Sequence, residues 1–187
     1  MSVQVCLEKL RTRPADCVSA ALPAADGGLP SEAGFYAWWV VRGSLPEVPR
    51  CPHPSEPTFD LLYVGIAPVS ATSGQTIRTR AIGNHLGGNI AASTFRFSLA
   101  SLLMETLSLH PQRKRKKVVL SRDENQALGE WQRTHLGSTW CEQADPWAIE
   151  AQVIAAMGPP LNLASNSAHP FYSTMRAARK RFRAAAV

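Results

Sequence analysis

Apolar positions along the chain follow two patterns, one typical of strands and one typical of helices. Residues 34–42 and 58–67 are rich in aromatic and β-branched side chains and have glycine at or near their ends, which predicts two strands. The segment 43–57 between them contains five prolines and is expected to be irregular. Consecutive strands joined by such a loop most often pair antiparallel, so we expect an antiparallel sheet.

Helical spacing of apolar residues dominates the chain after these strands. Ser121–Glu124 is a capping-box pattern, and Asp145 followed by Pro146 is a typical helix start. Short strands are expected at 118–120 and 138–142. The predicted helices span residues 76–86, 93–109, 121–136, 146–157 and 172–185.

Length and composition are those of one soluble folded domain. A chain of 187 residues with 45% hydrophobic and 18% charged residues can bury a core without a metal or a disulfide. No apolar run approaches the ~18 residues that span a bilayer, and the N-terminus lacks the features of a secretory signal. We therefore expect a cytoplasmic protein without a membrane partner. The cysteines lack zinc-site spacing and are expected to be ordinary thiols; they are Cys6, Cys17, Cys51 and Cys141.

Positive charge is segregated along the chain, which is more informative than its total. The chain has 20 Lys and Arg against 14 Asp and Glu, a net charge of +6. No acidic residue lies between Asp60 and Glu105, and none follows Glu150. Such stretches favour a polyanionic partner, because Lys and Arg neutralise phosphates, although each run alone is equally consistent with a solvated surface. The candidate nucleic-acid contacts are Arg78, Arg96, Arg113, Lys114, Arg115, Lys116, Lys117, Arg176, Arg179, Lys180 and Arg183.

Two of these basic groups have a predicted arrangement. The run 113–117 is expected to follow a phosphate backbone from a loop. The four cations of the predicted helix 172–185 occur at steps of three, one and three residues, which places them on one ridge. We expect both groups to contribute affinity and no sequence preference.

Glu150 is the first candidate for chemistry. The spacing places it on one helical stripe with Trp147, Ile154 and Met157, so a carboxylate shares a face with large apolar residues. A buried Glu is costly unless it is paired or bound to a metal. Glu150 is therefore either a surface or salt-bridged residue at the edge of the stripe or a carboxylate ligand for Mg²⁺, which uses one or two carboxylates plus water and phosphate oxygens.

Arg80, His85, Tyr36 and Tyr63 are further candidates. Arg80 and His85 lie on the predicted helix after the second strand, close enough to reach a shared cleft. An Arg fork suits a phosphate, and His can take a proton at neutral pH. Tyr36 and Tyr63 lie in the two predicted strands, where tyrosines either pack on the core or bring their hydroxyls to a site.

In their order along the chain, these residues resemble the motifs of the GIY-YIG nuclease family. The resemblance covers about residues 34 to 162. The sequences Ser93–Arg96 and His169–Tyr172 also resemble those of a bacterial branch of the family. The matching motifs are Gly34-Phe35-Tyr36, Tyr63-Val64-Gly65, Arg80, His85, Glu150 and Pro160-Leu161-Asn162.

The spacing departs from the compact family pattern at two places. The two tyrosines lie 27 residues apart, which the insertion 43–57 explains; restriction-enzyme-like members resemble this chain in tolerating an insertion there. Arg80 and His85 have four residues between them, where three is commoner, so Arg78 stays an alternative for the arginine role.

The resemblance implies an α/β (α+β) fold with a small three-stranded antiparallel sheet flanked by helices. With the sequence pattern at both ends, the expected organisation is an N-terminal helix and loop over residues 1–30, a catalytic core over 31–165 and a basic C-terminal helix, packed on the core, over 166–187. The resemblance also implies a phosphodiesterase with one divalent ion, Mg²⁺ or Mn²⁺, bound by Glu150.

Roles for the other motif residues are carried over by position. Arg80 would hold the scissile phosphate and stabilise its developing charge. Tyr36 or Tyr63 would orient and deprotonate the attacking water, and Asn162 would orient water or a phosphate oxygen. A free tyrosine has a pKa near 10, so the base needs either a lowered pKa or a proton relay through His85.

The leading hypothesis is a Mg²⁺-dependent DNA endonuclease that acts on its nucleic-acid substrate as a monomer or homodimer. One alternative is a catalytically inactive DNA-binding module of the same fold. A second alternative is an RNA-processing nuclease. Metal-dependent cleavage separates the first hypothesis from the inactive module, and a comparison of DNA with RNA separates it from the RNA enzyme.

Overall fold

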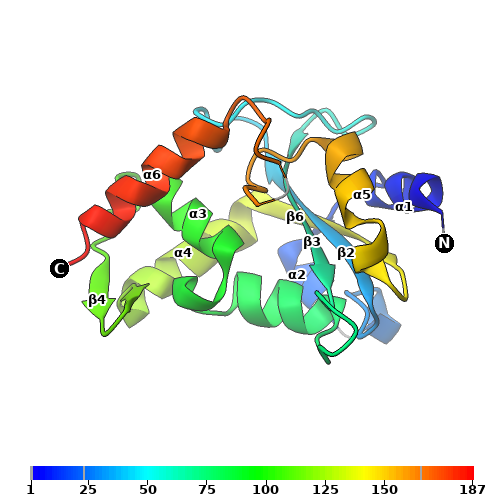
Figure 1. Cartoon of the computed structure of the whole chain (residues 1–187), viewed down its shortest axis with the longest axis horizontal. Coiled ribbons are helices and arrows are strands. Elements are labelled where there is room, and N and C mark those ends of the chain that lie inside the picture. Colours follow the sequence, from blue (N-terminus) through cyan, green and yellow to red (C-terminus); the bar gives the residue numbers. More distant parts are fainter. Residues whose placement is uncertain (1, 23, 165) are drawn as a thin grey trace.

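The computed structural model describes residues 2–22, 24–164 and 166–187. Its main sheet has the order β1-β6-β2-β3, and neighbouring strands are antiparallel (Figure 1). The strands expected at 34–42 and 58–67 are confirmed, as is their pairing. The strands are β1 (Ala15–Asp16), β2 (Gly34–Val41), β3 (Phe59–Ala67) and β6 (Leu136–Glu142).

The sheet has one strand more than expected. The two-residue β1 pairs with β6, placing Ala15 opposite Ser138 and Asp16 opposite Gly137. Two residues are too few for an alternating pattern, so the sequence carries no strand signal there. The α/β fold with an antiparallel sheet flanked by helices is otherwise as expected.

Helices cover both faces of the sheet (Figure 1). On one face lie α1 (Val3–Leu10) and α5 (Glu150–Met157). The other face carries α2 (Cys17–Ala21), α3 (Thr94–Leu102) and α4 (Arg122–His135), and α6 (Tyr172–Ala184) packs on α3. In the described residues, none of the helices has the length and apolar character needed to cross a membrane. The remaining helical segments are a π-helix, Thr79–Leu86, and the 3₁₀ turns Ala24–Asp26, Ile90–Ala92 and Pro146–Ala148.

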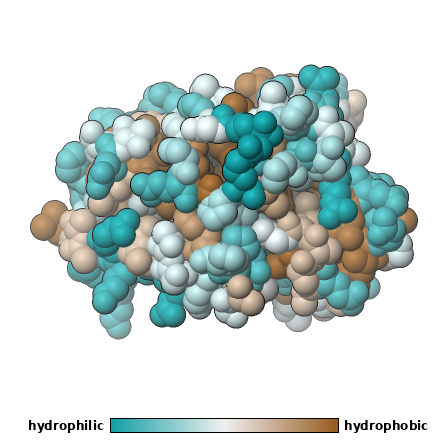
Figure 2. Space-filling model, turned by 90° about the horizontal axis from the view of Figure 1, so that it is seen from above, coloured by the Kyte–Doolittle hydropathy of each residue, from teal (hydrophilic) through white to brown (hydrophobic). Residues whose placement is uncertain are grey.

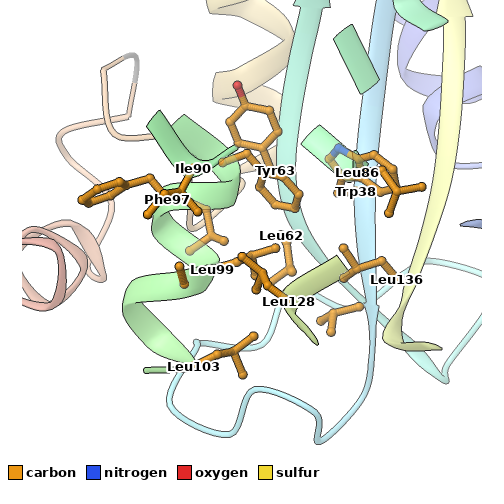
Figure 3. Packing of buried hydrophobic residues seen from close by; sticks show 14 of the residues in the cluster. Trp38, Leu62, Tyr63, Leu86, Ile90, Phe97, Leu99, Leu103, Leu128 and Leu136 are labelled. Atoms are coloured by element: carbon orange, nitrogen blue, oxygen red, sulfur yellow. The ribbon is translucent and has the colours of Figure 1, made fainter. Parts of the chain in front are cut away.

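Alternation along the central strand β2 builds two cores. Phe35 and Trp39 face the cluster under α1 and α5, whereas Tyr36 and Trp38 face the larger cluster under α3 and α4. Figure 3 shows the larger cluster. The Tyr63 hydroxyl points away from the other side chains of this cluster. Because both faces of β2 are buried, its residues are almost continuously apolar.

A bulge follows the pairing of Tyr63 in the β2–β3 ladder. Trp38 is opposite Tyr63 while Trp39 is opposite Leu61, so Leu62 is an extra residue in β3. The register between Tyr63 and Gly65 is regular, so Tyr63 faces the same side of the sheet as Tyr36, and the two ring centroids lie 6.5 Å apart. The extra residue places Leu62 in the same core cluster as Tyr63.

Several predicted helices differ in their limits. The helix expected at 93–109 ends at Leu102, and irregular turns follow in which Leu103 and Leu109 stay buried, so the apolar spacing outlasts the helix. The helix expected at 146–157 divides at Ile149 into a 3₁₀ turn and α5, and Asp145 makes no side-chain cap bond. The capping box of α4 is confirmed, with Ser121 and Glu124 as its partners.

Candidate active site

A cleft of about 950 Å³ runs between α6, the start of α5 and the sheet. The face of the molecule that carries α6 and α5 is hollowed between hydrophilic side chains (Figure 2). Glu150 is the single acidic residue among the described residues that line the cleft. Its lining includes four of the sequence-predicted motif residues, Tyr63, Arg80, Glu150 and Asn162, and four cations of α6, Arg176, Arg179, Lys180 and Arg183.

Tyr36 lies behind this cleft, in space that glycine leaves open. Tyr36 is fully buried and sits opposite Gly65 in the β2–β3 pair. A Cβ on Gly65 would lie 2.3 Å from the Tyr36 hydroxyl oxygen. At the start of β2, a Cβ on Gly34 would lie 2.1 Å from the carbonyl oxygen of Cys141. Both glycines are therefore needed for close packing around the first tyrosine.

A π-helix brings Arg80 and His85 to the same tyrosine. Residues Thr79–Leu86 form a π-helix instead of the expected α-helix. In an α-helix of about 3.6 residues per turn, a step of five residues points about 140° away, whereas i→i+5 bonding brings such residues closer to one face. Arg80 Nε donates to the Tyr36 hydroxyl at 3.2 Å, and His85 Nε2 lies 2.6 Å from the same oxygen.

His85 connects Tyr36 to a residue whose role the sequence did not show. Its Nδ1 is 2.5 Å from Ser93 Oγ, which also accepts from the backbone N–H of Arg96 at 3.0 Å. The tautomer protonated on Nδ1 leaves Nε2 to accept from the Tyr36 hydroxyl. Ser93 is the N-cap of α3, and the sequence signals at its position were this capping pattern and the family resemblance of Ser93–Arg96.

Burial controls the protonation of these groups. It lowers the pKa of His85 to about 3, and the charges of Arg80 and Arg96 act in the same direction, so His85 is neutral at ordinary pH. Burial raises the pKa of Tyr36 well above its usual value. It also raises the pKa of Tyr63, opposed by Arg80. The described residues therefore supply no tyrosine with a lowered pKa, and His85, whose own pKa is lowered, is a poor proton acceptor for the expected relay.

Glu150 begins α5 and is half-buried at the cleft. Burial raises the pKa of its carboxyl group, and the charge of Arg80 opposes that shift. Within the described residues it forms no ion pair or hydrogen bond that would occupy its oxygens. A carboxylate with this exposure to one cleft is free to take a cation.

Asn162 lines the cleft and is held by the edge strand of the sheet. Its Oδ1 accepts from the backbone N–H of Val64 at 2.9 Å, and its Nδ2 donates to the Val64 carbonyl at 2.7 Å. Both ends of the amide thus bind β3, and this contact fixes the strand beside Tyr63. The expectation that Asn162 also orients water or a phosphate oxygen stays a prediction.

Arg78 and Arg96 do not face nucleic acid, contrary to expectation. Arg78 donates to the carbonyls of Ala21 and Leu22 at 2.6 and 2.5 Å and so anchors the N-terminal segment. This contact also removes Arg78 as an alternative for Arg80. Arg96 is 1% exposed and is enclosed by oxygens of the chain. Burial lowers the pKa of Arg96 to about 10, assisted by the nearby charge of Arg133.

The Arg96 guanidinium joins three elements by hydrogen bonds. It donates to the Leu86 carbonyl at 2.7 Å, to the Asn125 carbonyl at 2.5 Å and to the Gln132 side chain. Gln132 in turn donates to the His85 carbonyl at 3.0 Å. The π-helix that carries His85 is therefore bound to α3 and α4 through a buried cation with neutral acceptors.

The basic run 113–117 lies in a hairpin and outside the cleft. Its strands are β4 (Gln112–Lys114) and β5 (Lys117–Val119), so the expected loop is corrected to a two-stranded sheet with an exposed turn. Arg113 is bonded through its backbone N–H to the carbonyl of Val187 at 2.6 Å. The hairpin thus lies at the C-terminal end of α6 (Figure 1).

We expect Gly65→Ala to displace Tyr36 and weaken both the fold and the site. The added Cβ would overlap the Tyr36 ring, and overpacking of this kind costs about 1–3 kcal/mol. Chemical denaturation measures the loss. Gly74→Ala is the matched control because nothing lies within 4 Å of its added Cβ. Equal stability of the two variants would contradict the close approach at Gly65.

The comparison with protein families covers this site except Arg183. The family model described as GIY-YIG catalytic domain matches residues 34–181. This range starts at the first residue of β2 and ends within α6, so it contains both tyrosines, the π-helix and Glu150. Neither a curated protein nor a solved structure gives a significant match.

Proposed function

This chain belongs to the GIY-YIG catalytic domain family, and from that premise we propose that it is a Mg²⁺-dependent endonuclease that hydrolyses phosphodiester bonds in DNA. Members of the family are generally nucleases that act on nucleic acids. The observation that carries the proposal is one unpartnered carboxylate, Glu150, in a cleft whose other charged residues are all cations. In the proposed organisation, residues 31–165 form the catalytic core and α6 carries cations over it.

The donor set at Glu150 fits a single hard cation. No group of three or more His, Cys, Asp or Glu side chains in the described part of the chain gathers around a common point, which argues against a multi-ligand or two-metal site. One carboxylate, with water and phosphate oxygens completing the shell, is a common arrangement for Mg²⁺, and Mn²⁺ takes similar ligands. When bound there, the ion would stabilise negative charge on the leaving oxygen.

Hydrogen bonds orient Arg80 so that it can bind the scissile phosphate. Its Nε donates to Tyr36 and its Nη1 donates to Gln75 at 3.0 Å, so the guanidinium plane is oriented, and Tyr63 at the cleft also interacts with it. Donors fixed in advance stabilise developing charge without reorganisation. The Tyr36–His85 pair therefore supports the reaction first of all by orienting Arg80.

The two tyrosines receive different roles. Tyr63 lines the cleft, and we assign to it the orientation of the attacking water. Tyr36 has no exposed surface, so its hydroxyl acts inside the core, where it donates a hydrogen bond to His85 Nε2 and accepts one from Arg80 Nε. Replacement of Tyr63 by Phe is therefore expected to reduce turnover while nucleic-acid binding is kept.

A substrate comparison tests the proposed function. The purified chain is incubated with single-stranded DNA, duplex DNA and RNA of one sequence, with Mg²⁺ and with EDTA. We expect metal-dependent cleavage within the DNA strands. Faster cleavage of RNA would favour the RNA-processing alternative, and tight binding without any cleavage would favour the inactive module.

The pH dependence of cleavage should follow Glu150. Its raised pKa means that protonation removes the metal ligand at a pH above the ordinary value of 4.5, so the rate falls on the acid side. Because Mg²⁺ competes with the proton, higher Mg²⁺ should move the midpoint to lower pH. Rate profiles at two Mg²⁺ concentrations measure this. A pH midpoint near 6.5 that does not change with the Mg²⁺ concentration would instead indicate a histidine with an ordinary pKa.

A further inference from the structure

Two arginines of α6 share one aromatic ring at the cleft. The guanidinium carbons of Arg179 and Arg183 lie 5.1 and 4.7 Å from the centroid of Phe97 on α3. Phe97 is 7% exposed, and its ring packs edge-on against Phe182 at 5.3 Å, so its position is fixed. Stacking on a fixed ring orients the planar guanidinium groups and limits their motion.

The arginine pair lacks a negative partner in the described residues. The ion pairs there join Arg42 and Arg50 to Asp60 and His110 to Glu124, and none involves α6. The Nε of Arg179 is buried without a hydrogen-bond acceptor. Burial lowers the pKa of Arg179, and the neighbouring charge of Arg183 acts in the same direction. Two neighbouring like charges without a carboxylate partner form a site that an anion would complete.

The other residues that line the cleft indicate which class of ligand carries the anion. Beside the cations, the lining contains Leu161, Leu163 and Tyr172. Arg176 lies over the Tyr172 ring at 5.6 Å, which links the aromatic residue to the basic ridge. A positive groove that also offers apolar and aromatic surface is typical of sites for one nucleic-acid strand, whose unpaired bases stack on such surface.

We propose that Arg179 and Arg183, stacked on Phe97, form a second phosphate-binding site that holds the backbone of a single nucleic-acid strand in the cleft. This proposal rests on the proposed function, because it assigns the strand that Arg80 and Glu150 would act on. Both guanidinium groups engage one phosphate, so neither is effective without the other. The site fixes the position of the strand and takes no part in bond cleavage.

Binding of a labelled single-stranded oligonucleotide in EDTA tests the site independently of cleavage. At matched salt we expect Arg179→Gln, Arg183→Gln and the double variant each to weaken affinity about tenfold, since one phosphate contact is lost in every case. The slope of log affinity against log salt should fall by about 0.7, the value for one phosphate on a single strand. Arg181→Gln is the matched control; Arg181 is exposed on the same helix and does not line the cleft.

Several outcomes would overturn the proposal. If Arg181→Gln weakens binding as much as the other variants, the effect is that of net charge alone. If the double variant loses the sum of the single losses, the arginines act as separate ridge charges. Tighter binding of the matching duplex, with the same dependence on Arg183, would overturn the single-strand assignment. Thermal unfolding shows whether each variant is folded, and the exposed Arg183 decides the result if Arg179→Gln unfolds.

A free anion is distinguished from a strand by a direct titration. Inorganic phosphate is titrated against the wild-type chain and the double variant. Loss of phosphate binding in the double variant with unchanged oligonucleotide affinity would assign the site to free phosphate and overturn the strand assignment. A missing cleavage activity would leave these binding results intact, so failure of the proposed function is separable from failure of this site.

Discussion

Glu150→Gln is expected to abolish metal-dependent cleavage while nucleic-acid binding is retained. The amide keeps the size of the side chain but lacks the charge that a divalent ion requires. A bound ion supplies several kcal/mol of charge stabilisation, and a loss of about 4 kcal/mol corresponds to roughly a thousandfold in rate. Affinity for an oligonucleotide in EDTA should stay the same or increase, because the one negative charge among the described cleft residues is removed.

Glu130→Gln provides the matched control for this result. Glu130 is exposed on α4 and does not line the cleft, so this variant should cleave like the wild-type chain. Rates are measured under single-turnover conditions over a range of Mg²⁺ concentrations. Cleavage by Glu150→Gln within a few-fold of wild type would show that Glu150 is not the metal ligand.

Arg96→Met is expected to cause the largest loss of stability. The change leaves the carbonyls of Leu86 and Asn125 and the side chain of Gln132 without their donor in a buried place. A buried acceptor without a partner costs about 1–3 kcal/mol, so we expect a loss of roughly 3 kcal/mol or more. In a chain of this length, that corresponds to a decrease of about 10 °C in Tm.

The stability of Arg96→Met is compared with that of a variant in which an exposed arginine is replaced. Arg122→Met removes the same charge at the exposed start of α4 and should change stability by no more than about 0.5 kcal/mol. Calorimetric Tm values of both variants are compared with wild type. If Arg96→Met melts within 2 °C of wild type, the buried network does not bind the π-helix to α3 and α4 as inferred.

Periodic segments of the fold were predictable from the sequence. The runs that became β2 and β3 are continuous apolar segments between breakers, and the Ser121 box marked the start of α4. The π-helix and the two-residue β1 were not predictable, because neither has a sequence period of its own. The bulge at Leu62 is set by tertiary packing and not by local propensity.

Charge patterning indicated the region of the candidate site but did not distinguish the roles of its arginines. Arg78, Arg80 and Arg96 come from one acid-free stretch, yet only Arg80 lines the cleft. Arg78 and Arg96 are instead bound by backbone carbonyls, and which carbonyls remain free is decided by tertiary structure. The full burial of Tyr36 behind Tyr63 was not predictable either, because both tyrosines occur in similar strand sequences and tertiary packing decides which one is buried.

Conversion of a closed circular DNA by the purified chain shows whether the cleft at Glu150, Arg80 and Tyr63 hydrolyses phosphodiesters with a divalent ion. We predict nicked or linear DNA with Mg²⁺, none with EDTA, and activity restored when Mg²⁺ is added back in excess. Conversion at the same rate in EDTA, or none at any Mg²⁺ or Mn²⁺ concentration, would contradict metal-dependent hydrolysis at this cleft.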